Sequence, residues 1–301
     1  MTTILREAWR GSRALTALAG LMTLLLAVCL AGLALDGRTL LGQPVWLKPA
    51  KFAASFAVYA LTLAWLLARL GRGRRAARTA AAVVAATSVL EVGIIAVQAA
   101  RGRSSHFNST TPLDGLLWRG MGAVILVLWL GTLLVAILLW RDPPADRAVA
   151  WAGRLGLVLL LVGTAQGLLM LVPTRAQLDA DARGADTLLG AHAVGVPDGG
   201  PGLPLLGWST TGGDLRVGHF VGIHGLQAML LVAMLLGRLV ADPARRTRLT
   251  VVLAGAYAGL LALVTWQALR GQPLLAPDAA TLTALAVLVA VTVAGGAAAL
   301  R

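Results

Sequence analysis

Residues 190–227 read GAHAVGVPDGGPGLPLLGWSTTGGDLRVGHFVGIHGLQ and join a Gly- and Pro-rich loop to an apolar run. Three of the four histidines of the chain lie in this stretch. His192 stands in the loop, which is too rich in glycine and proline to form a helix or a strand. His219 and His224 stand at the start of the apolar run. The stretch therefore predicts a polar site where a loop meets an apolar helix.

The composition around this stretch predicts a membrane protein. The 301 residues are 58% hydrophobic and 13% charged, with a mean hydropathy of +0.79, whereas soluble domains are about 25% charged. The net charge is +13, but the basic residues fall between apolar runs and form no basic face with interleaved aromatics, so no nucleic-acid partner is predicted. The single cysteine, Cys29, excludes a disulfide framework and a thiolate metal cluster.

Eight apolar runs are long enough to cross a hydrocarbon core of about 30 Å as helices. The first resembles a signal peptide in layout, but it is long enough to span and lacks a clear cleavage site, so we expect it to remain as a span. The sequence predicts an all-α, polytopic transmembrane bundle that forms a single domain over residues 1–301. The runs are 14–35, 50–68, 79–100, 116–140, 148–172, 218–240, 249–269 and 279–300.

The distribution of charge predicts the orientation of this bundle. With eight spans both termini lie on one side, and most of the 26 basic residues, including the arginine cluster within 69–78, fall on that side. The positive-inside rule then predicts that both termini are cytoplasmic. Only Lys48 and Lys51 among the basic residues are lysine, which is typical of a GC-rich bacterial genome. We therefore expect a multi-pass protein of the bacterial cytoplasmic (inner) membrane, in contact with the lipid bilayer.

The chain also contains an internal repeat. Gln98-Ala-Ala-Arg-Gly and Gln267-Ala-Leu-Arg-Gly lie 169 positions apart, and the same offset relates Arg69-Leu70 to Arg238-Leu239. With Gln166 as a third glutamine, a basic or imidazole residue stands 47 or 48 positions before each glutamine, at Lys51, Arg119 and His219. This predicts three tandem hairpins flanked by the first and last helices. The alternative is that membrane thickness imposes similar lengths on any hairpin.

One acidic residue lies inside a predicted span. Glu91 would cost about 2.5 to 3.5 kcal/mol in lipid, so we expect it to face the bundle interior. Gln98 lies seven residues later on the same helical face, and Arg101 follows at the outer end. Glu91 could contribute to a site or could pair with Lys51 or Arg119 to lock the helices together.

The histidines allow a metal site but do not by themselves form one. His219 and His224 are five residues apart and do not share a helical face, whereas His224 does share one with Gln227. A metal would need further ligands from the loops, such as His106, Asp198, Asp214 or, less favoured, His192. A haem would need axial histidines that face each other from two helices. A single histidine is more often an ordinary hydrogen-bonding residue than a metal ligand, so the metal site stays one of two interpretations.

The outer segment 173–217 is long for a loop without structure of its own, and such loops are usually functional or disordered. Its second half is rich in turns yet apolar, so we expect an extracytoplasmic lid over the bundle. No named catalytic motif occurs, including the P-loop, HExxH, GxSxG and CxxC patterns. Whether the chain is an enzyme is therefore left open at this level.

Four phrases together resemble a family of uncharacterised bacterial integral membrane proteins with no established activity. They are WLKPAKF (46–52), QAARGRSSHFN (98–108), DGGPGLPLLGWST (198–210) and GDLRVGHFVGIHGLQ (213–227). The resemblance implies a membrane protein and transfers no function. It also implies that His106, Asn108, Asp214, His219 and His224 belong to wording that recurs in the family.

The favoured hypothesis is an outward-facing polar pocket that binds a small molecule or a cofactor, either a metal ion, a haem or a quinone-like molecule, with redox chemistry as one option. The alternatives are a transporter of a small anion, a membrane-embedded metal-dependent hydrolase and a structural subunit. The expected ligand-binding residues are Lys51, Glu91, Gln98, Arg101, Asn108, Arg119, Asp214 and Gln227. The expected metal ligands are His106, His219 and His224, with His192 less favoured.

Overall fold

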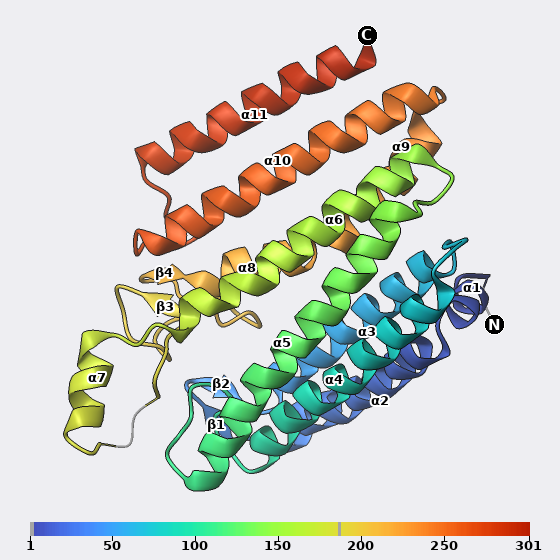
Figure 1. Ribbon diagram of the computed structural model, residues 1–301. Helices are drawn as coiled ribbons and strands as arrows, with labels where there is room; N and C mark the ends of the chain where they lie inside the picture. The colour runs from blue at the N-terminus through green and yellow to red at the C-terminus, as the bar shows by residue number, and fades with distance from the viewer. Residues whose placement is uncertain (1–2, 186–187) are drawn as a thin grey trace. The chain divides into compact units, whose positions relative to one another are not determined.

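The computed structural model describes residues 3–185 and 188–301, and most of them form long helices (Figure 1). The all-α prediction is confirmed. The chain divides into two compact units. Unit 1 comprises Met1–Val135 with Leu171–Ala191, and unit 2 comprises Ala136–Met170 with His192–Arg301.

Unit 1 is built around three long helices that contact one another, α2, α3 and α4. The short helix α1 contacts α2 and α3, and a two-stranded antiparallel pair, β1 with β2, precedes α3. The first part of α5, up to Val135, belongs to this unit, as does α7. The bounds are α1 Thr3–Gly11, α2 Arg13–Leu35, β1 Thr39–Leu40, β2 Gln43–Pro44, α3 Leu47–Leu67, α4 Arg74–Ala100, α5 Pro112–Arg141 and α7 Arg175–Ala182.

Unit 2 is built around α6 and α10, both of which contact α8 and α9. The last helix, α11, contacts α10, and a short antiparallel pair, β3 with β4, precedes α8. The bounds are α6 Arg147–Ala165, the 3-10 helix η1 Gln166–Leu171, β3 Ala193–Val194, β4 Gly213–Asp214, α8 Leu215–Ile223, α9 Gly225–Leu239, α10 Pro243–Leu269 and α11 Ala279–Leu300.

Seven of the described helices are long and apolar enough to span a membrane, and α8 with α9 form an eighth candidate if the pair counts as one span. The two helices meet at an angle of 47°. The sequence predicts one continuous helix over 218–240, whereas the structure has two helices that meet at His224. Likewise, the run predicted as helix over 148–172 becomes a 3-10 helix from Gln166 onward.

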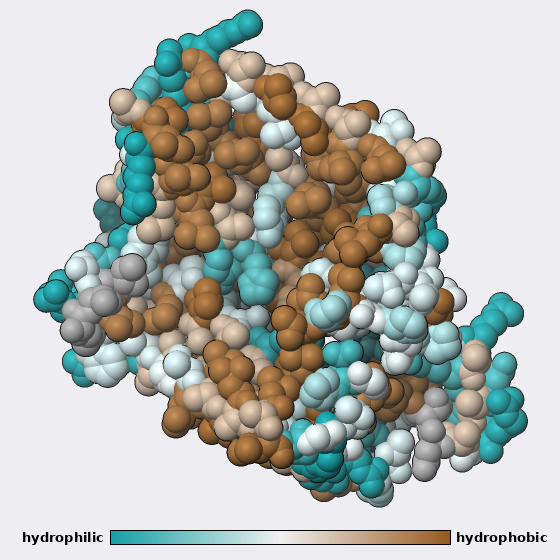
Figure 2. All heavy atoms as spheres, turned by 180° about the vertical axis from the view of Figure 1, so that it is seen from behind, coloured by the Kyte–Doolittle hydropathy of each residue, from teal (hydrophilic) through white to brown (hydrophobic). Residues whose placement is uncertain are grey.

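Large apolar side chains cover the outer faces of these helices. Leu24 is 64% exposed, Leu231 66% and Val293 66%. Hydrophobic side chains dominate the face shown in Figure 2, and hydrophilic ones gather mainly toward its margins. In water such surfaces would be costly, but in a bilayer they contact lipid tails. The chain is therefore a multi-pass membrane protein.

The helices of unit 2 approach closely at glycines. A Cβ at Gly222 of α8 would lie 2.3 Å from the Cα of Gly163 on α6, and one at Gly225 would lie 2.6 Å from the Cβ of Leu159. Small residues at helix contacts are a common means of packing in membranes, because they let backbones meet without side chains between them. This packing brings the carbonyl groups of α6 within reach of side chains on α8.

The repeat at an offset of 169 extends to the geometry of two hairpins. Helices α4 and α10 both contain 27 residues, and their first residues, Arg74 and Pro243, differ by 169. Each ends in the same turn: Gly102 and Gly271 have φ values of 67° and 72°, and their N–H groups donate to Ala99 and Ala268. In the described structure, α4 and α10 therefore correspond in length, in starting position and in the turn that ends them. The three-hairpin arrangement, the single domain over 1–301 and the cytoplasmic position of the termini stay predictions.

Candidate functional site

The break between α8 and α9 leaves backbone groups that a continuous helix would pair. Tyr257 of α10 donates its hydroxyl hydrogen to the carbonyl of Val221 at 2.7 Å, next to the break. Within a membrane, broken helices persist where such side chains satisfy the freed backbone groups. Gly222 and Gly225 flank the break and are held against α6 by the close approaches described above. The break is therefore supported by both α6 and α10.

His219 on α8 is fixed in one orientation. Its Nδ1 lies 2.7 Å from the carbonyl oxygen of Gly163. Because a carbonyl group only accepts, Nδ1 carries the hydrogen, and in the neutral ring Nε2 is then an acceptor. Gly218 precedes it, and a Cβ there would lie 2.4 Å from Oγ1 of Thr265 and 2.9 Å from Oε1 of Gln166. Glycine at 218 thus lets α8 approach both polar side chains.

Gln166 presents a buried acceptor beside His219. Its Nε2 donates to Oγ1 of Thr265 at 2.8 Å, and the Thr265 hydroxyl donates to the carbonyl of Leu261 at 2.7 Å. These bonds orient the amide group and leave Oε1 buried without a hydrogen-bond partner. On α9, Oε1 of Gln227 is also buried without a partner. Unpaired buried acceptors are rare and call for an explanation such as a ligand or ordered water.

Aromatic rings line the same part of unit 2. The Phe220 ring centroid lies 6.0 Å from that of Trp208, 6.2 Å from that of His219 and 6.1 Å from that of His224. These are edge and tilted contacts of the kind aromatic groups favour. Phe220 therefore joins the two histidines of the broken span to the loop that carries Trp208.

Within this loop, His192 and Asp198 form a local pair. Nδ1 of His192 lies 2.7 Å from Oδ2 of Asp198, and the backbone N–H of Ala193 donates to Oδ1 at 2.8 Å. Burial opposes ionisation of Asp198, but the hydrogen bonds from His192 and Ala193 outweigh it and lower the pKa of Asp198 to about 2. This pairing leaves His192 engaged in holding the loop.

Asp214 is the N-cap of α8. Its side chain accepts the backbone N–H of Arg216 at 3.0 Å and that of Ser209 at 2.8 Å, and it pairs with the Arg216 guanidinium at 2.6 Å. With a side-chain exposure of 2%, Asp214 serves here to start the helix and to anchor the preceding loop.

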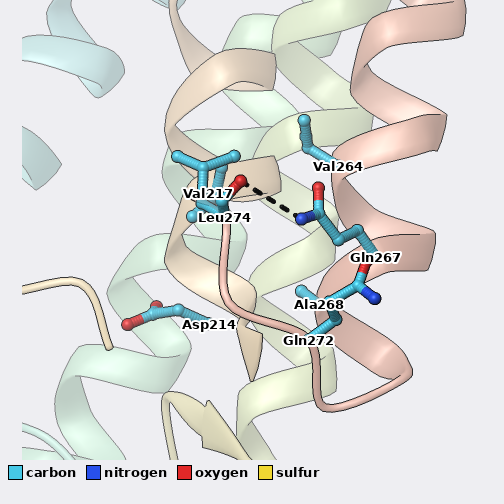
Figure 3. Close-up of a pocket in the computed structure, with 7 residues that line it drawn as sticks. All are labelled: Asp214, Val217, Val264, Gln267, Ala268, Gln272 and Leu274. Carbon is cyan, nitrogen blue, oxygen red and sulfur yellow. Dashed lines mark hydrogen bonds between the residues drawn. The ribbon is translucent and has the colours of Figure 1, made fainter. Parts of the chain in front are cut away.

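A small recess next to Asp214 leaves no space for a water molecule. Figure 3 shows that Gln267 reaches across it toward Leu274, whereas the carboxylate of Asp214 points away from Gln267. Nε2 of Gln267 donates to the carbonyls of Pro273 at 2.7 Å and Leu274 at 3.2 Å. The recess is therefore closed by the hairpin and offers no room for a ligand.

In unit 1, Gln98 and Arg101 form a buried network around Asp114, whose side chain is 0% exposed. Nε2 of Gln98 and Nη1 of Arg101 both lie 2.9 Å from Oδ1 of Asp114, and the Thr111 hydroxyl donates to Oδ2 at 2.8 Å. Asp114 is not among the site residues expected from the sequence. Its contacts make it the centre of the network, which closes the hairpin between α4 and α5.

Asn108 and His106 hold the loop between these helices. Nδ2 of Asn108 donates to the carbonyl of Ser104 at 3.0 Å, and its Oδ1 accepts the N–H of Thr110 at 3.1 Å. The His106 ring lies 5.3 Å from that of Trp118 and 6.1 Å from that of Phe52, measured between centroids. Both residues therefore have structural partners in unit 1.

Three further expected residues of unit 1 differ in burial. Glu91 is 4% exposed, and its Oε2 has no hydrogen-bond partner. Arg119 is exposed, and its Nη1 lies near Gly115 on the same helix. Lys51, at the start of α3, is partly buried and has partners in the structure.

Across residues 3–185 and 188–301, no three His, Cys, Asp or Glu side chains group together as a metal ion would require. The expected metal site therefore has no support in this part of the chain. Gln166 and Thr265 lie next to α8 at Gly218, and Tyr257 supports the break. The sequence signal of all three residues is weak. In the sequence, Gln166 stands out only as one of the three glutamines of the predicted repeat.

Comparisons with protein-family models, with curated proteins and with solved structures found no match for this chain. They therefore give no support to the expected bacterial family. What the chain does has to be inferred from the geometry around the broken span.

Proposed function

We propose that this membrane protein binds a small ligand carrying hydrogen-bond donors at the outer half of the broken span, between His219 and Gln166. The observation that carries the proposal is the buried Oε1 of Gln166, which has no partner although its amide is held in place by Thr265. A ligand donor would satisfy this oxygen. Nε2 of His219, an acceptor in the neutral ring, would take a second donor.

The surroundings favour a hydroxylated aromatic ring, such as that of a quinol, among ligands of this kind. Phe220 and Trp208 supply aromatic edges beside His219, and rings stack or meet edge-on with about 0.5 to 1.5 kcal/mol of gain. A quinol also enters from the lipid phase, where this protein resides. The proposal concerns binding, and any redox role would rest on it.

The acceptors at this site are neutral amide and imidazole groups, and the described residues group no three metal-binding side chains. A metal ion, a haem or a metal-dependent hydrolase therefore has less support than an organic ligand. Asp214 and His192 anchor the loop next to the site, and Trp208 of that loop contacts Phe220. These contacts support a lid role for the part of 173–217 that lies in unit 2.

The test measures the binding of a short-chain quinol to the detergent-purified protein. Binding is detected as quenching of the tryptophan fluorescence. His219→Ala and Gln166→Leu each remove one acceptor, and we expect either change to weaken binding about tenfold, the loss of about 1.4 kcal/mol. The matched control is His106→Ala, because that histidine belongs to unit 1, where its ring packs against Trp118 and Phe52. It should leave binding unchanged.

The oxidised form of the ligand is a further control. The corresponding quinone carries acceptors where the quinol has donors, so it should bind more weakly than the quinol. If the wild-type protein binds no quinol, or if both acceptor variants bind as the wild type does, the proposal is wrong.

A second candidate is a transporter, since broken spans recur at the sites of secondary transporters. The bend of 47° between α8 and α9 favours it. For an anion the unpaired acceptors would be unfavourable neighbours, so a donor-bearing or cationic solute fits better than the small anion suggested by the sequence. Solute uptake by proteoliposomes that His219→Ala abolishes would favour transport over simple binding.

For the setting of the protein, we propose the cytoplasmic membrane of a bacterium with both termini inside. Support comes from arginine at the helix ends of the terminus side, including Arg69, Arg147 and Arg245. The site at His219 would then open toward the outer leaflet.

A further inference from the structure

Glu91 of α4 is an acidic side chain deep inside a membrane-spanning helix of unit 1. It lies about 14 Å from Ala100 at the outer end of α4, at about 1.5 Å per residue. The residue is 4% exposed, and its Oε2 has no hydrogen-bond partner. Neither the packing of the unit nor the ligand proposed for unit 2 accounts for this unpaired oxygen.

The polar side chains nearest to Glu91 along α4 donate elsewhere. The hydroxyl of Ser88, one turn away, donates to the carbonyl of Val84 at 2.6 Å, and that of Thr87 donates to Val83 at 2.8 Å. Gln98, two turns toward the outer end, donates to Asp114 and Ser104. The free carboxylate oxygen therefore has no donor on its own helix.

The charge around Glu91 comes from neighbouring helices. Lys48 of α3 is the charged group whose field acts on the carboxyl. Away from the inner ends of the packed helices, the ionisable groups are Lys48, Lys51 and Tyr59 on α3, Cys29 on α2, and Asp114 and Arg119 on α5. A metal cation would meet a single carboxylate and the repulsion of Lys48, whereas a proton needs one oxygen only.

We propose that Glu91 is a proton-binding site inside unit 1, whose carboxylate takes up one proton in the membrane interior and releases it again. Uptake forms the O–H bond at the unpaired Oε2 and removes the negative charge, and release restores the carboxylate and returns the proton to water. Ionisable residues inside membrane spans are a common feature of proton relays. This inference is independent of the ligand proposed for unit 2.

The experiment measures the protonation of Glu91 directly. Infrared spectra of the full-length purified protein are recorded over the pH range in which it stays folded, for the wild type and for Glu91→Gln. We expect a carbonyl stretching band of a protonated carboxyl that declines as the pH rises and that Glu91→Gln lacks. Glu7→Gln is the matched control, because Glu7 pairs with Arg69 at 3.0 Å outside the long spans and should leave the band unchanged.

A second measurement covers the case in which Glu91→Gln fails to fold. Dicyclohexylcarbodiimide adds to protonated carboxyl groups in apolar surroundings and remains attached as an N-acylurea, which mass spectrometry locates. In the wild type we expect modification at Glu91 and not at Asp114, whose oxygens already accept from Gln98, Thr111 and Arg101. Absence of both the band and the modification at every pH would mean that Glu91 stays ionised, and the proposal would be wrong.

Discussion

Individual glycines set how closely α6 and α8 approach, and this gives a prediction at the residue scale. A methyl group at Gly163 or Gly222 would lie 2.3 to 2.4 Å from backbone atoms of the other helix, which cannot move aside as a flexible side chain can. We expect Gly163→Ala and Gly222→Ala each to lower the free energy of unfolding by about 1 to 3 kcal/mol. Thermal unfolding in detergent measures this.

Gly255 on α10 is the matched control for these two changes. Nothing lies within 4 Å of a Cβ at this position, so Gly255→Ala should be neutral or should stabilise the helix by up to about 1 kcal/mol. Equal losses for all three variants would show that the close approach of α6 and α8 contributes nothing to stability.

The pair of His192 and Asp198 predicts that the stability of the folded loop depends on pH. The pKa of Asp198, about 2, lies below its ordinary value of 3.8, so the ionised carboxylate stabilises the folded loop above pH of about 4. That contribution, on the order of 2 kcal/mol, is lost as the pH falls from about 4 toward 2. The protection factors of the His192 and Ala193 amides against hydrogen exchange should fall over this range.

A variant separates this pair from general acid effects. Asp198→Asn should accelerate exchange at the same two amides already at neutral pH, since the amide accepts more weakly than the carboxylate. Unchanged exchange in this variant would contradict the role assigned to Asp198.

At the same scale, the sequence predicts burial and shared helical faces better than it predicts contacts between separate segments. Glu91 was expected to be buried, and it is. That Gln98 and Arg101 bind a ligand stays a prediction; in the structure both contact Asp114, a partner 16 and 13 positions away. The spacing of residues within one helix predicts which face they share. It does not predict which side chain of another segment meets that face, because this depends on tertiary packing.

At the scale of the element, two hairpins of the repeat differ in how deeply the acidic partner of their arginine is buried. This difference predicts that removing the arginine lowers the stability of the protein by different amounts. Arg101 pairs with Asp114, whose side chain is 0% exposed, whereas Arg270 pairs with Asp278, which is 38% exposed. Arg101→Ala would leave a buried carboxylate short of a donor and should cost about 1 to 3 kcal/mol. Arg270→Ala removes an exposed pair and should cost about 0 to 1 kcal/mol.

Chemical unfolding of the two variants beside the wild type measures this contrast. The two arginines stand at equivalent positions after equivalent helices, so each serves as the other's control. A larger loss for Arg270→Ala than for Arg101→Ala would contradict the argument from burial.

The length and existence of most helices followed from apolar runs, but the break at His224 did not. The run 218–240 is apolar apart from its histidines, Gln227 and Arg238 near its end, so its pattern predicts one helix. The break depends on Tyr257 of α10 and on the glycines that meet α6, which are contacts with other segments. A Gly-rich stretch such as GHFVGIHG permits a break without requiring one.

For the whole molecule, the topology turns on whether α8 and α9 together cross the membrane. If they do, eight spans follow, and residues on either side of the pair, such as Thr210 and Ala241, lie on opposite sides. If the pair instead returns to the side it entered from, only seven spans remain and the two termini lie on opposite sides. The charge distribution favours the first arrangement, because it gathers the basic residues with both termini.

Single cysteines introduced into a Cys29→Ser background distinguish these arrangements. In intact cells we expect an impermeant thiol reagent to modify Thr210→Cys and to leave Ala241→Cys unmodified until the membrane is permeabilised. Gly71→Cys, in the inner loop after α3, should behave like Ala241→Cys, because that loop lies within the arginine-rich segment 69–78. Modification of both Thr210→Cys and Ala241→Cys from outside would mean that the pair is re-entrant. The site at His219 would then lie in a loop that enters and leaves by one face, a geometry that suits binding from that face and not passage across.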